Sequence, residues 1–379
     1  MNVLMITTWY GSITEENPTA GVFHYEQSMA LKPYCNTALY FPYDKGLSKP
    51  FIKGEERGLL TYRRRDYRFP KLGKLQRVMH IFRDLNRICK EFKPDILHAH
   101  CACFTGVFVT LFGKLHGYPV VITEHSPMEH FPLNNKTAMK QLHFAYRNSA
   151  ANVCVSPNSM ERLQEHFPDC SYQVIYNGVY DPCSIPKDGN TYRVPNHINC
   201  CIIASFYSRD IKGYQYLLPA VSELKKMGKP VVLHICGGGD FQGEYEEMAK
   251  ELNISDCCIF HGNCSKQKVY TVLSQMDFAI SASLYESAGV SVEEALLLGK
   301  PMLVTKSGGA NSLVNDEMAL VVEKGSTQAL VDGIQNMVKK LPEFSAEKIA
   351  SYAAKNFEMD SISRQYIKLY QEILERSNH

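Results

Sequence analysis

The stretch that decides the fold is residues 278–310, FAISASLYESAGVSVEEALLLGKPMLVTKSGGA. Its apolar start, Phe278–Ser281, predicts a buried strand, and residues 291–298 predict a helix. Gly299 is the expected helix end, and Met302–Thr305 predicts a second strand. A strand, a helix and a strand in this order predict a parallel sheet.

Two carboxylates flank the loop between that strand and helix. Glu286 is expected in the loop, and Glu294 is expected in the first helical turn. Between them, the backbone N–H groups of Gly289, Val290 and Ser291 are expected at the positive end of the helix dipole. Such a helix start binds anions. Hydroxyl-binding carboxylates on both sides would suit a nucleotide sugar, although acids in a first turn often only complement the dipole.

The same stretch resembles the donor-site signature of retaining glycosyltransferases of family 4, with Ala288 where the family often has an aromatic residue. The resemblance covers nearly the whole chain and is strongest over residues 201–322. It implies an α/β protein with the GT-B fold, in which two doubly wound Rossmann-like domains face each other across a cleft and a C-terminal helix crosses back to the first domain.

Apolar runs and helical patterns alternate along both halves of the chain, which by itself predicts two parallel α/β domains. We expect an N-terminal acceptor-side domain at 1–185, a linker at 181–199, a donor-binding domain at 196–357 and the returning helix at 358–379. The predicted strands are residues 3–7, 37–41, 96–99, 120–123, 153–156 and 174–176, followed by 201–204, 231–236, 258–261, 278–281, 302–305 and 319–322.

The resemblance also implies donor-binding residues outside the opening stretch. Lys212-Gly213 matches the family's basic site for the donor phosphates, and Arg209 is the candidate for its basic partner, although a solvated loop charge is the plainer interpretation of either side chain. The full set expected at the nucleotide sugar is Gly21, Arg209, Lys212, Gly237, Gly238, Phe260, Glu286, Ser287, Gly289, Val290, Ser291 and Glu294.

The catalytic residues implied by the resemblance are Lys212, Glu286 and His125, which follows a predicted strand. Lone histidines are more often structural than catalytic. The run His98-Ala99-His100-Cys101-Ala102-Cys103 superficially resembles a metal site. On a strand its histidines lie on one face and its cysteines on the other, so the four cannot converge. We therefore expect neither a metal nor a cofactor.

Composition excludes several classes of protein. With 379 residues, 45% hydrophobic and 21% charged, the chain is an ordinary globular protein with room for two domains. A net charge of +2 argues against a nucleic-acid binder. No secretory leader precedes the first strand, so the thirteen cysteines are expected to be reduced, in a cytoplasmic protein that is peripheral to the inner face of a membrane at most.

Residues 57–93 are locally basic, with Arg63-Arg64-Arg65 at their centre and aromatic and apolar residues between the charges. One interpretation is a solvated face. The other is docking of a lipid-linked acceptor at an anionic membrane, where each basic residue adds about 1 kcal/mol.

The sequence therefore favours a retaining, metal-independent hexosyltransferase of surface polysaccharide biosynthesis. Its donor would be a UDP or GDP sugar, and its acceptor a glycan or lipid-linked saccharide. Two alternatives remain at this point: a GT-B nucleotide-sugar epimerase or hydrolase, which would release product without an acceptor, and a non-catalytic sugar-binding protein.

Overall fold

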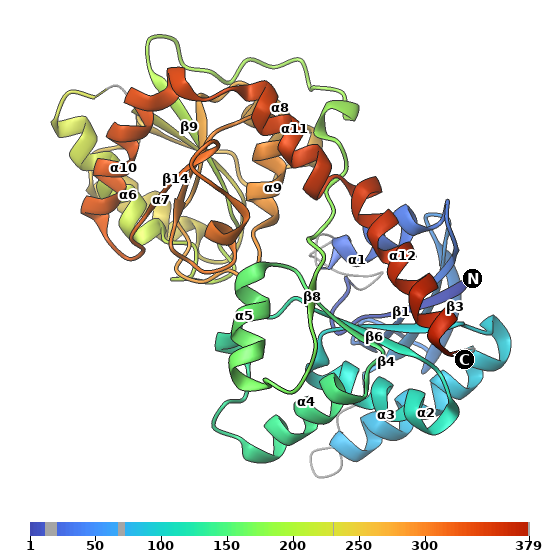
Figure 1. The fold of residues 1–379 in the computed structure, drawn as a ribbon. Coiled ribbons are helices and arrows are strands. Elements are labelled where there is room, and N and C mark those ends of the chain that lie inside the picture. Colours follow the sequence, from blue (N-terminus) through green and yellow to red (C-terminus); the bar gives the residue numbers. More distant parts are fainter. Residues whose placement is uncertain (12–20, 67–72, 230, 378–379) are drawn as a thin grey trace. The chain divides into compact units, whose positions relative to one another are not determined.

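The computed structural model describes residues 1–11, 21–66, 73–229 and 231–377 (Figure 1). It divides into two compact units. The first comprises Met1–Val155, Ser159–Tyr176 and Ile362–His379, and the second comprises Ser156–Asn158 and Asn177–Ser361. The chain thus enters the second unit earlier than the expected linker. Residues 181–197 are mostly irregular, but the last part of the expected linker lies in a strand that begins at Ile198.

The first unit is built on an eight-stranded sheet with the order β3-β4-β2-β1-β5-β6-β7-β8. All its neighbouring strands are parallel except β3 and β4. The strands are β1 (Asn2–Ile6), β2 (Asn36–Asp44), β3 (Phe51–Glu56), β4 (Leu59–Arg65), β5 (Ile96–His100), β6 (Val120–Glu124), β7 (Ala151–Cys154) and β8 (Gln173–Val174).

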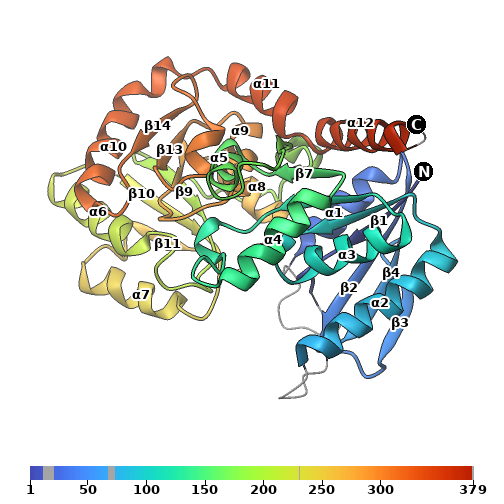
Figure 2. The same cartoon turned by 60° about the horizontal axis from the view of Figure 1, so that its bottom comes forward.

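Helices cover both faces of this sheet because side chains alternate along each strand. Leu4 and Ile6 pack in the core beneath α2 (Gly73–Phe92), α3 (Val107–His116), α4 (Lys136–Asn148) and α5 (Pro157–His166). Figure 2 shows α2, α3 and α4 along that face. Val3 and Met5 point the other way, toward α1 (Val22–Leu31) and α12 (Met359–Ser377). The prediction that the C-terminal helix returns to the first domain is confirmed.

The hairpin of β3 and β4 was not predicted, and it corrects the interpretation of the basic stretch. Arg63 lies within β4 and is buried, where it pairs with Asp44 at 2.7 Å and with Glu56 at 2.6 Å. Arg64 is also buried and forms an ion pair with Asp84. These two arginines are neither a solvated face nor a membrane-docking patch. The aromatic and apolar residues Tyr67, Phe69 and Leu72 of the same stretch lie outside the described residues.

The second unit is built on a six-stranded parallel sheet with the order β11-β10-β9-β12-β13-β14. In chain order this is the 3-2-1-4-5-6 arrangement of dinucleotide-binding sheets, whose order reverses between the first and fourth strands. The reversal here lies between β9 and β12. The strands are β9 (Ile198–Ile203), β10 (Val231–Cys236), β11 (Cys258–Phe260), β12 (Phe278–Ser281), β13 (Met302–Thr305) and β14 (Ala319–Val322).

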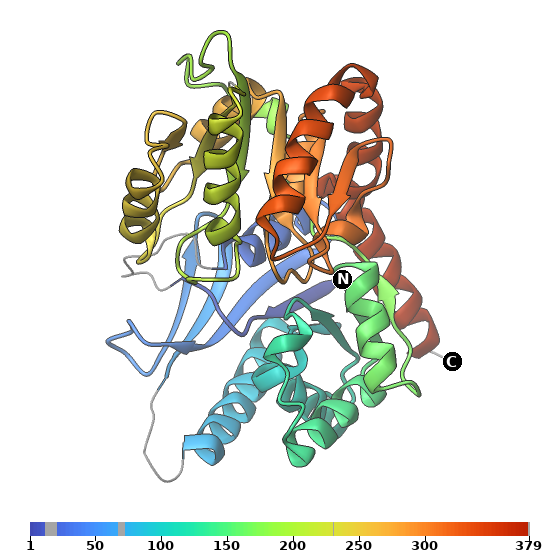
Figure 3. The same cartoon turned by 90° about the vertical axis from the view of Figure 1, so that its left-hand side faces the viewer.

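Both faces of the second sheet are also covered by helices, as the fully buried β10 requires. On one face α6 (Tyr214–Lys226) contacts α7 (Gln242–Glu251) and α10 (Thr327–Lys340), and α6 and α10 lie side by side in Figure 3. α9 (Val290–Leu297) instead contacts α11 (Ala346–Phe357). The remaining α-helix is α8 (Lys266–Ser274). A short π-helix, η1 (Ala102–Gly106), and the short 3-10 helices η2 (Met128–His130), η3 (Pro182–Ser184), η4 (Ala310–Leu313) and η5 (Leu341–Glu343) complete the described elements.

The cysteines are all free thiols, and most of them are buried. Burial raises the pKa of the Cys258 thiol to about 12 and that of Cys103 to about 12. These two thiols are therefore protonated and unreactive at neutral pH. Among the described residues, no helix has an apolar stretch long enough to cross a membrane.

Candidate donor site and histidine cluster

The loops that leave β9 and β12 meet at the reversal point of the second sheet. The backbone N–H of Leu284, in the β12 loop, donates to the carbonyl of Ile211 in the β9 loop at 2.7 Å. Gly213 lies so close to the β12 loop that a Cβ there would stand 1.9 Å from the carbonyl oxygen of Ala282, and its φ is +75°. Only glycine fits this position. The approach it permits brings the neighbouring Lys212 to the β12 loop.

Lys212 and Glu286 form an ion pair at this point. The Lys212 Nζ lies 2.6 Å from Glu286 Oε1, and the Ser283 hydroxyl donates to the same oxygen at 2.8 Å. The side chains of Lys212 and Glu286 are 26% and 19% exposed, so solvent or a ligand can reach them. The structure thus brings together two of the three residues expected to be catalytic.

A third loop holds the backbone of Glu286 in place. Gly309 donates its N–H to the Glu286 carbonyl at 2.8 Å, and Glu286 donates its own to Ser307 at 3.0 Å. A Cβ on Gly309 would lie 2.3 Å from the carbonyl carbon of Ser287. The glycine pair after β13 therefore allows the two loops to touch, and the backbone of Glu286 is held from both sides.

The N-terminus of α9 lies next to this pair in the chain. Gly289 has φ +134° and ψ 70°, a backbone conformation that side chains disfavour, and the helix begins at Val290. The N–H groups of the first helical residues have no acceptor within the helix, and they lie at the positive end of its dipole. Val290 is 38% exposed, so this helix start reaches the surface of the unit.

The second predicted carboxylate, Glu294, lies beyond the first turn of α9, whose acidic residue is Glu293 instead, because the helix begins at Val290. Glu294 is largely buried, and its Oε1 accepts a hydrogen bond from the Tyr270 hydroxyl at 2.9 Å. Its neighbour Glu293 is fully buried, and neither carboxylate oxygen has a hydrogen-bond partner among the described residues. Burial, and then the charge of Glu294, raise the pKa of Glu293 well above its usual value. Neither Tyr270 nor the burial of Glu293 carries a signal in the sequence, because both follow from helix packing.

The remaining donor residues expected in this unit have structural partners as well. Arg209 is exposed and forms an ion pair with Glu244. A Cβ on Gly237 would stand 2.0 Å from the Ala204 carbonyl oxygen, and one on Gly238 would stand 2.6 Å from Asn263 Oδ1. Close backbone packing thus already requires both glycines. Half-buried Phe260 ends β11, with its ring 6.2 Å from that of Phe206.

In the first unit, Gly21 caps the N-terminus of α1 with φ +67°, and a Cβ there would lie 2.7 Å from the carbonyl oxygen of Trp9. Residues 12–20 of the loop before it lie outside the described residues. His125 directly follows β6. Glu124, buried at the end of β6, accepts an N–H bond from Ala102 at 3.0 Å, which ties β6 to η1, and one from Ser126 at 2.9 Å, which fixes the turn that contains the histidine.

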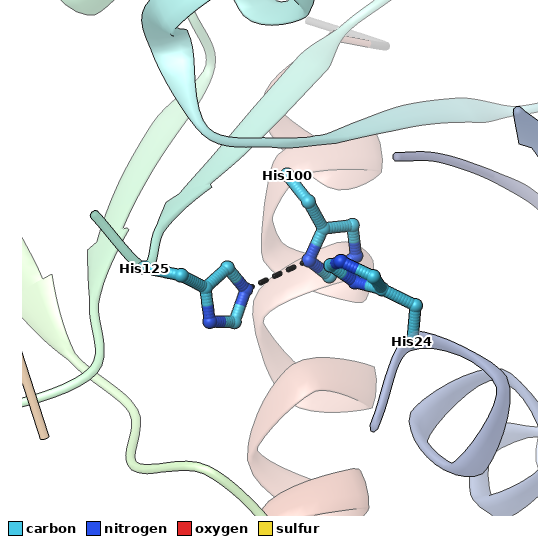
Figure 4. Close-up of side chains that lie close together, drawn as sticks. All are labelled: His24, His100 and His125. Carbon is cyan, nitrogen blue, oxygen red and sulfur yellow. Dashed lines mark hydrogen bonds between the residues drawn. The ribbon is translucent and has the colours of Figure 1, made fainter. Parts of the chain in front are cut away.

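His125 does not stand alone. Its Nε2 lies 2.8 Å from Nδ1 of His100 at the end of β5, and the ring of His24 from α1 completes a cluster of imidazoles (Figure 4). One ligand-forming nitrogen from each of the three lies within 4.8 Å of the others. Burial lowers the pKa of His24 and of His100 well below the usual value, so both are neutral at pH 7.

His98 stacks on His100 but has other partners. Its Nδ1 lies 2.6 Å from the Tyr370 hydroxyl and its Nε2 lies 2.7 Å from Thr123 Oγ1. Burial lowers the pKa of His98 to about 3. The converging set is therefore His24, His100 and His125, rather than the His98–Cys103 run. Sequence reasoning missed His24, because its only signal was its place in the helix after Gly21.

Two known protein families match the two halves of the chain. Residues 201–356 match the family model described as glycosyl transferases group 1, and residues 47–181 match the one described as glycosyltransferase family 4. Among curated relatives, an alpha-monoglucosyldiacylglycerol synthase of Streptococcus pneumoniae is 28% identical over 71% of this chain and 65% of its own length. An alpha-D-kanosaminyltransferase of Streptomyces kanamyceticus is 24% identical over 78% of this chain and 82% of its own length.

A phosphatidylinositol N-acetylglucosaminyltransferase subunit of Arabidopsis thaliana is 23% identical over 77% of this chain. The matched region spans only 65% of that relative's length. Among solved structures, sucrose-phosphate synthase of Thermosynechococcus elongatus superposes with a TM-score of 0.76 at 15% identity, over 99% of this chain and all of the other. Anabaena HepE in complex with UDP superposes with a TM-score of 0.74 at 18% sequence identity, over 98% of this chain and all of the HepE chain. These structures share the fold. The chain belongs to the family 4 glycosyltransferases, also described as glycosyl transferases group 1, and has the GT-B fold.

Proposed function

We propose that this protein transfers a hexosyl unit from a UDP or GDP sugar to a glycan or lipid-linked acceptor, with retention of configuration and without a metal, in surface polysaccharide biosynthesis. The observation that carries the proposal is the Lys212–Glu286 pair, held at the reversal point of the second sheet and next in the chain to the start of α9. Ligands of such sheets bind outside the carboxyl ends of the strands at this point.

The leaving nucleoside diphosphate gains negative charge as its bond to the sugar breaks. Lys212 and the first N–H groups of α9 (Gly289, Val290 and Ser291) would stabilise that charge, since fixed donors aimed at a developing charge need no reorganisation. In the free protein Glu286 neutralises Lys212 at 2.6 Å. A bound diphosphate would share the ammonium group, which leaves Glu286 able to accept from sugar hydroxyls.

Glu294 would accept hydrogen bonds from the ribose hydroxyls, with its carboxylate oriented by the Tyr270 hydroxyl. Hydrogen bonds to a charged group contribute about 1.5–3 kcal/mol each. We assign His125 and Glu286 to the transferred sugar, and Arg209, Gly21, Gly237, Gly238, Phe260 and Ser287 to the rest of the donor. In the retaining reaction the acceptor would attack the face from which the diphosphate departs.

The names of two relatives support a lipid acceptor, since one is an alpha-monoglucosyldiacylglycerol synthase and another is a subunit of a phosphatidylinositol N-acetylglucosaminyltransferase. A membrane-facing surface would have to lie elsewhere than Arg63 and Arg64. On α2, Leu75 and Met79 are 57% and 56% exposed, and the exposed Arg83, Arg87 and Lys90 follow at helical spacing. We propose this face as the contact with an anionic membrane.

The test is to incubate the protein with UDP and GDP sugars, with and without a mixture of lipid and glycan acceptors, and to measure nucleotide release and product mass. A transferase releases nucleoside diphosphate mainly when an acceptor is present, and NMR of the product should show the anomeric configuration of the donor. Rapid release of free sugar or an epimer without acceptor would favour the epimerase or hydrolase. Binding without any turnover would favour the sugar-binding protein.

A further inference from the structure

The histidine cluster of the first unit has a feature that sugar positioning does not require. Neither ring nitrogen of His24 has a hydrogen-bond partner among the described residues, and Nε2 of His100 has none either, although both side chains are fully buried. Leaving a buried polar group unpaired costs about 1–3 kcal/mol. A ligand between the three rings would satisfy one nitrogen of His24, whereas Nε2 of His100 lies on the side of its ring away from the nitrogen that faces His125.

The ring orientations suit a metal ion. The His24 ring stands at 73° to His100 and 89° to His125, with centroids 4.4 Å and 5.6 Å away, so its plane meets the other two edge-on. His100 and His125 are stacked at 19°, and their facing nitrogens already lie 2.8 Å apart. Tetrahedral Zn²⁺ with Zn–N bonds of about 2.0–2.1 Å separates its ligand nitrogens by about 3.3 Å. A small opening of this hydrogen bond would admit the ion.

The three ligands come from fixed positions. His24 lies in α1, His100 ends β5, and His125 follows β6, where Glu124 fixes the backbone. His98 packs against His100 with centroids 4.6 Å apart and directs its own nitrogens to Tyr370 and Thr123. Supporting contacts of this kind orient metal ligands. His125 alone of the three is partly exposed, so an ion can arrive from its side.

We propose that His24, His100 and His125 form a three-imidazole site for a borderline transition-metal cation of the Zn²⁺, Co²⁺, Ni²⁺ or Cu²⁺ class. Imidazole nitrogen suits these ions, and three protein ligands leave a coordination position open. One of the two facing nitrogens carries the proton of the hydrogen bond between His100 and His125. Metal binding therefore requires that ring to shift its proton to its other nitrogen, after which both facing nitrogens bind the metal. Because the ion occupies His125, it inhibits sugar transfer instead of supporting it.

The chain offers a probe beside the cluster. Trp9 is its single tryptophan, and the indole ring lies 5.5 Å from His24 and 6.4 Å from His125. Paramagnetic Ni²⁺, Co²⁺ and Cu²⁺ quench nearby tryptophan fluorescence, whereas closed-shell Zn²⁺ quenches little. Titration of untagged protein with NiCl₂ should therefore quench Trp9 saturably, and added ZnCl₂ should compete the nickel away and restore the signal.

Three variants make the test specific. His24→Phe keeps a flat ring against Phe23, whose ring lies 4.0 Å away, and removes the unpaired nitrogens, so folding should be preserved. It should weaken nickel binding by about tenfold or more. His125→Ala, at a partly exposed position, should do the same if His24→Phe fails to fold. His143→Ala alters the other candidate set, His143, Asp169 and Cys170, and should leave the Trp9 titration unchanged.

The absorption spectrum of bound Co²⁺ distinguishes binding at the three histidines from binding at cysteines. Co²⁺ bound only by imidazole and water shows no thiolate-to-cobalt charge-transfer band, whereas binding at cysteine does. The expected result is one Co²⁺ per chain without that band, lost in His24→Phe. Unsaturable quenching, a thiolate band, or equal binding by wild type and His24→Phe would overturn the proposal. These measurements use metal alone, so they are independent of whether the protein transfers hexose.

Discussion

The Lys212 ammonium group lies 2.6 Å from the Glu286 carboxylate, although 74 residues separate the two in the chain. The glycine after Lys212 and the glycine pair after β13 bring together the three loops that make this contact possible. An ion pair with partial exposure is a weak contributor to stability. Its place at the reversal point of the sheet, where sheets of this kind bind ligands, motivates the role in sugar transfer that we propose for it.

Replacing Lys212 by Ala should lower kcat by about 10²–10³, with a much smaller change in donor affinity, because the charge that it stabilises grows in the transition state. Steady-state rates at several donor concentrations separate the two effects. Lys212→Arg is the matched control and should retain part of the rate. A raised KM with an unchanged kcat would mean that Lys212 only binds the donor.

Glu293→Gln should stabilise the protein at neutral pH. The raised pKa means that the folded state keeps the proton of Glu293 where the unfolded chain releases it. The contribution of protonated Glu293 to the free energy of unfolding is therefore fully present below the unfolded pKa of about 4.3. It falls by about 1.4 kcal/mol per pH unit as the pH rises toward the folded pKa. Gln does not titrate, so its advantage should grow with pH.

Urea unfolding of Glu293→Gln and wild type at pH values from about 4 to 8 measures this difference. Glu347→Gln, at an exposed position in the first turn of α11, is the control and should follow wild type. If the stabilities of Glu293→Gln and wild type run parallel across the range, Glu293 is not held as a buried neutral acid.

Arg63→Gln should destabilise the first unit by about 3–5 kcal/mol, because it takes this cation away from the fully buried Asp44 and the half-buried Glu56. Thermal unfolding of the variant checks this. Arg65→Gln removes an arginine whose Nη1 donates to the Ser48 carbonyl at an exposed site, and should cost much less. Equal melting temperatures for the two variants would contradict the buried network.

Replacing Arg83, Arg87 and Lys90 by Gln should weaken binding to anionic vesicles, since these exposed residues continue the face that carries Leu75 and Met79. Co-sedimentation should detect the loss at low salt. The difference should fade near 1 M salt, where the Debye length falls to about 3 Å. Binding by the triple variant that matches wild type at low salt would remove α2 as the contact.

Local patterns predicted the strands of the second sheet well, and residues 231–236, 278–281, 302–305 and 319–322 form strands with the predicted bounds. The apolar runs of β10, β12 and β13 are continuous because both faces of these strands are covered, whereas the edge strand β14 is only partly buried. The β3–β4 hairpin was missed because its inward arginines look polar until Asp44 and Asp84, distant in sequence, supply their partners. A local charge count cannot find such pairs.

The candidate site likewise has local features that the sequence predicts and long-range contacts that it does not. The spacing of Glu286 and Glu294 and the glycine before α9 are local features, so the sequence revealed them. The contacts of Glu286 with Lys212, of Glu294 with Tyr270 and of His125 with His100 join separate elements, so only the folded chain reveals them. Arg209 matched a basic position locally, but folding places it beside Glu244 on the surface.

The most direct test of the proposed donor site is calorimetric titration of wild type and Glu294→Gln with UDP, GDP and ADP in the presence of EDTA. Wild type should bind one of the nucleotides without added metal. Glu294→Gln should bind it about 10–100-fold more weakly while melting at the same temperature, because a charged acceptor of the ribose hydroxyls is lost. Binding that requires magnesium or manganese, or equal affinity of the two proteins, would contradict a metal-independent donor site at Glu294.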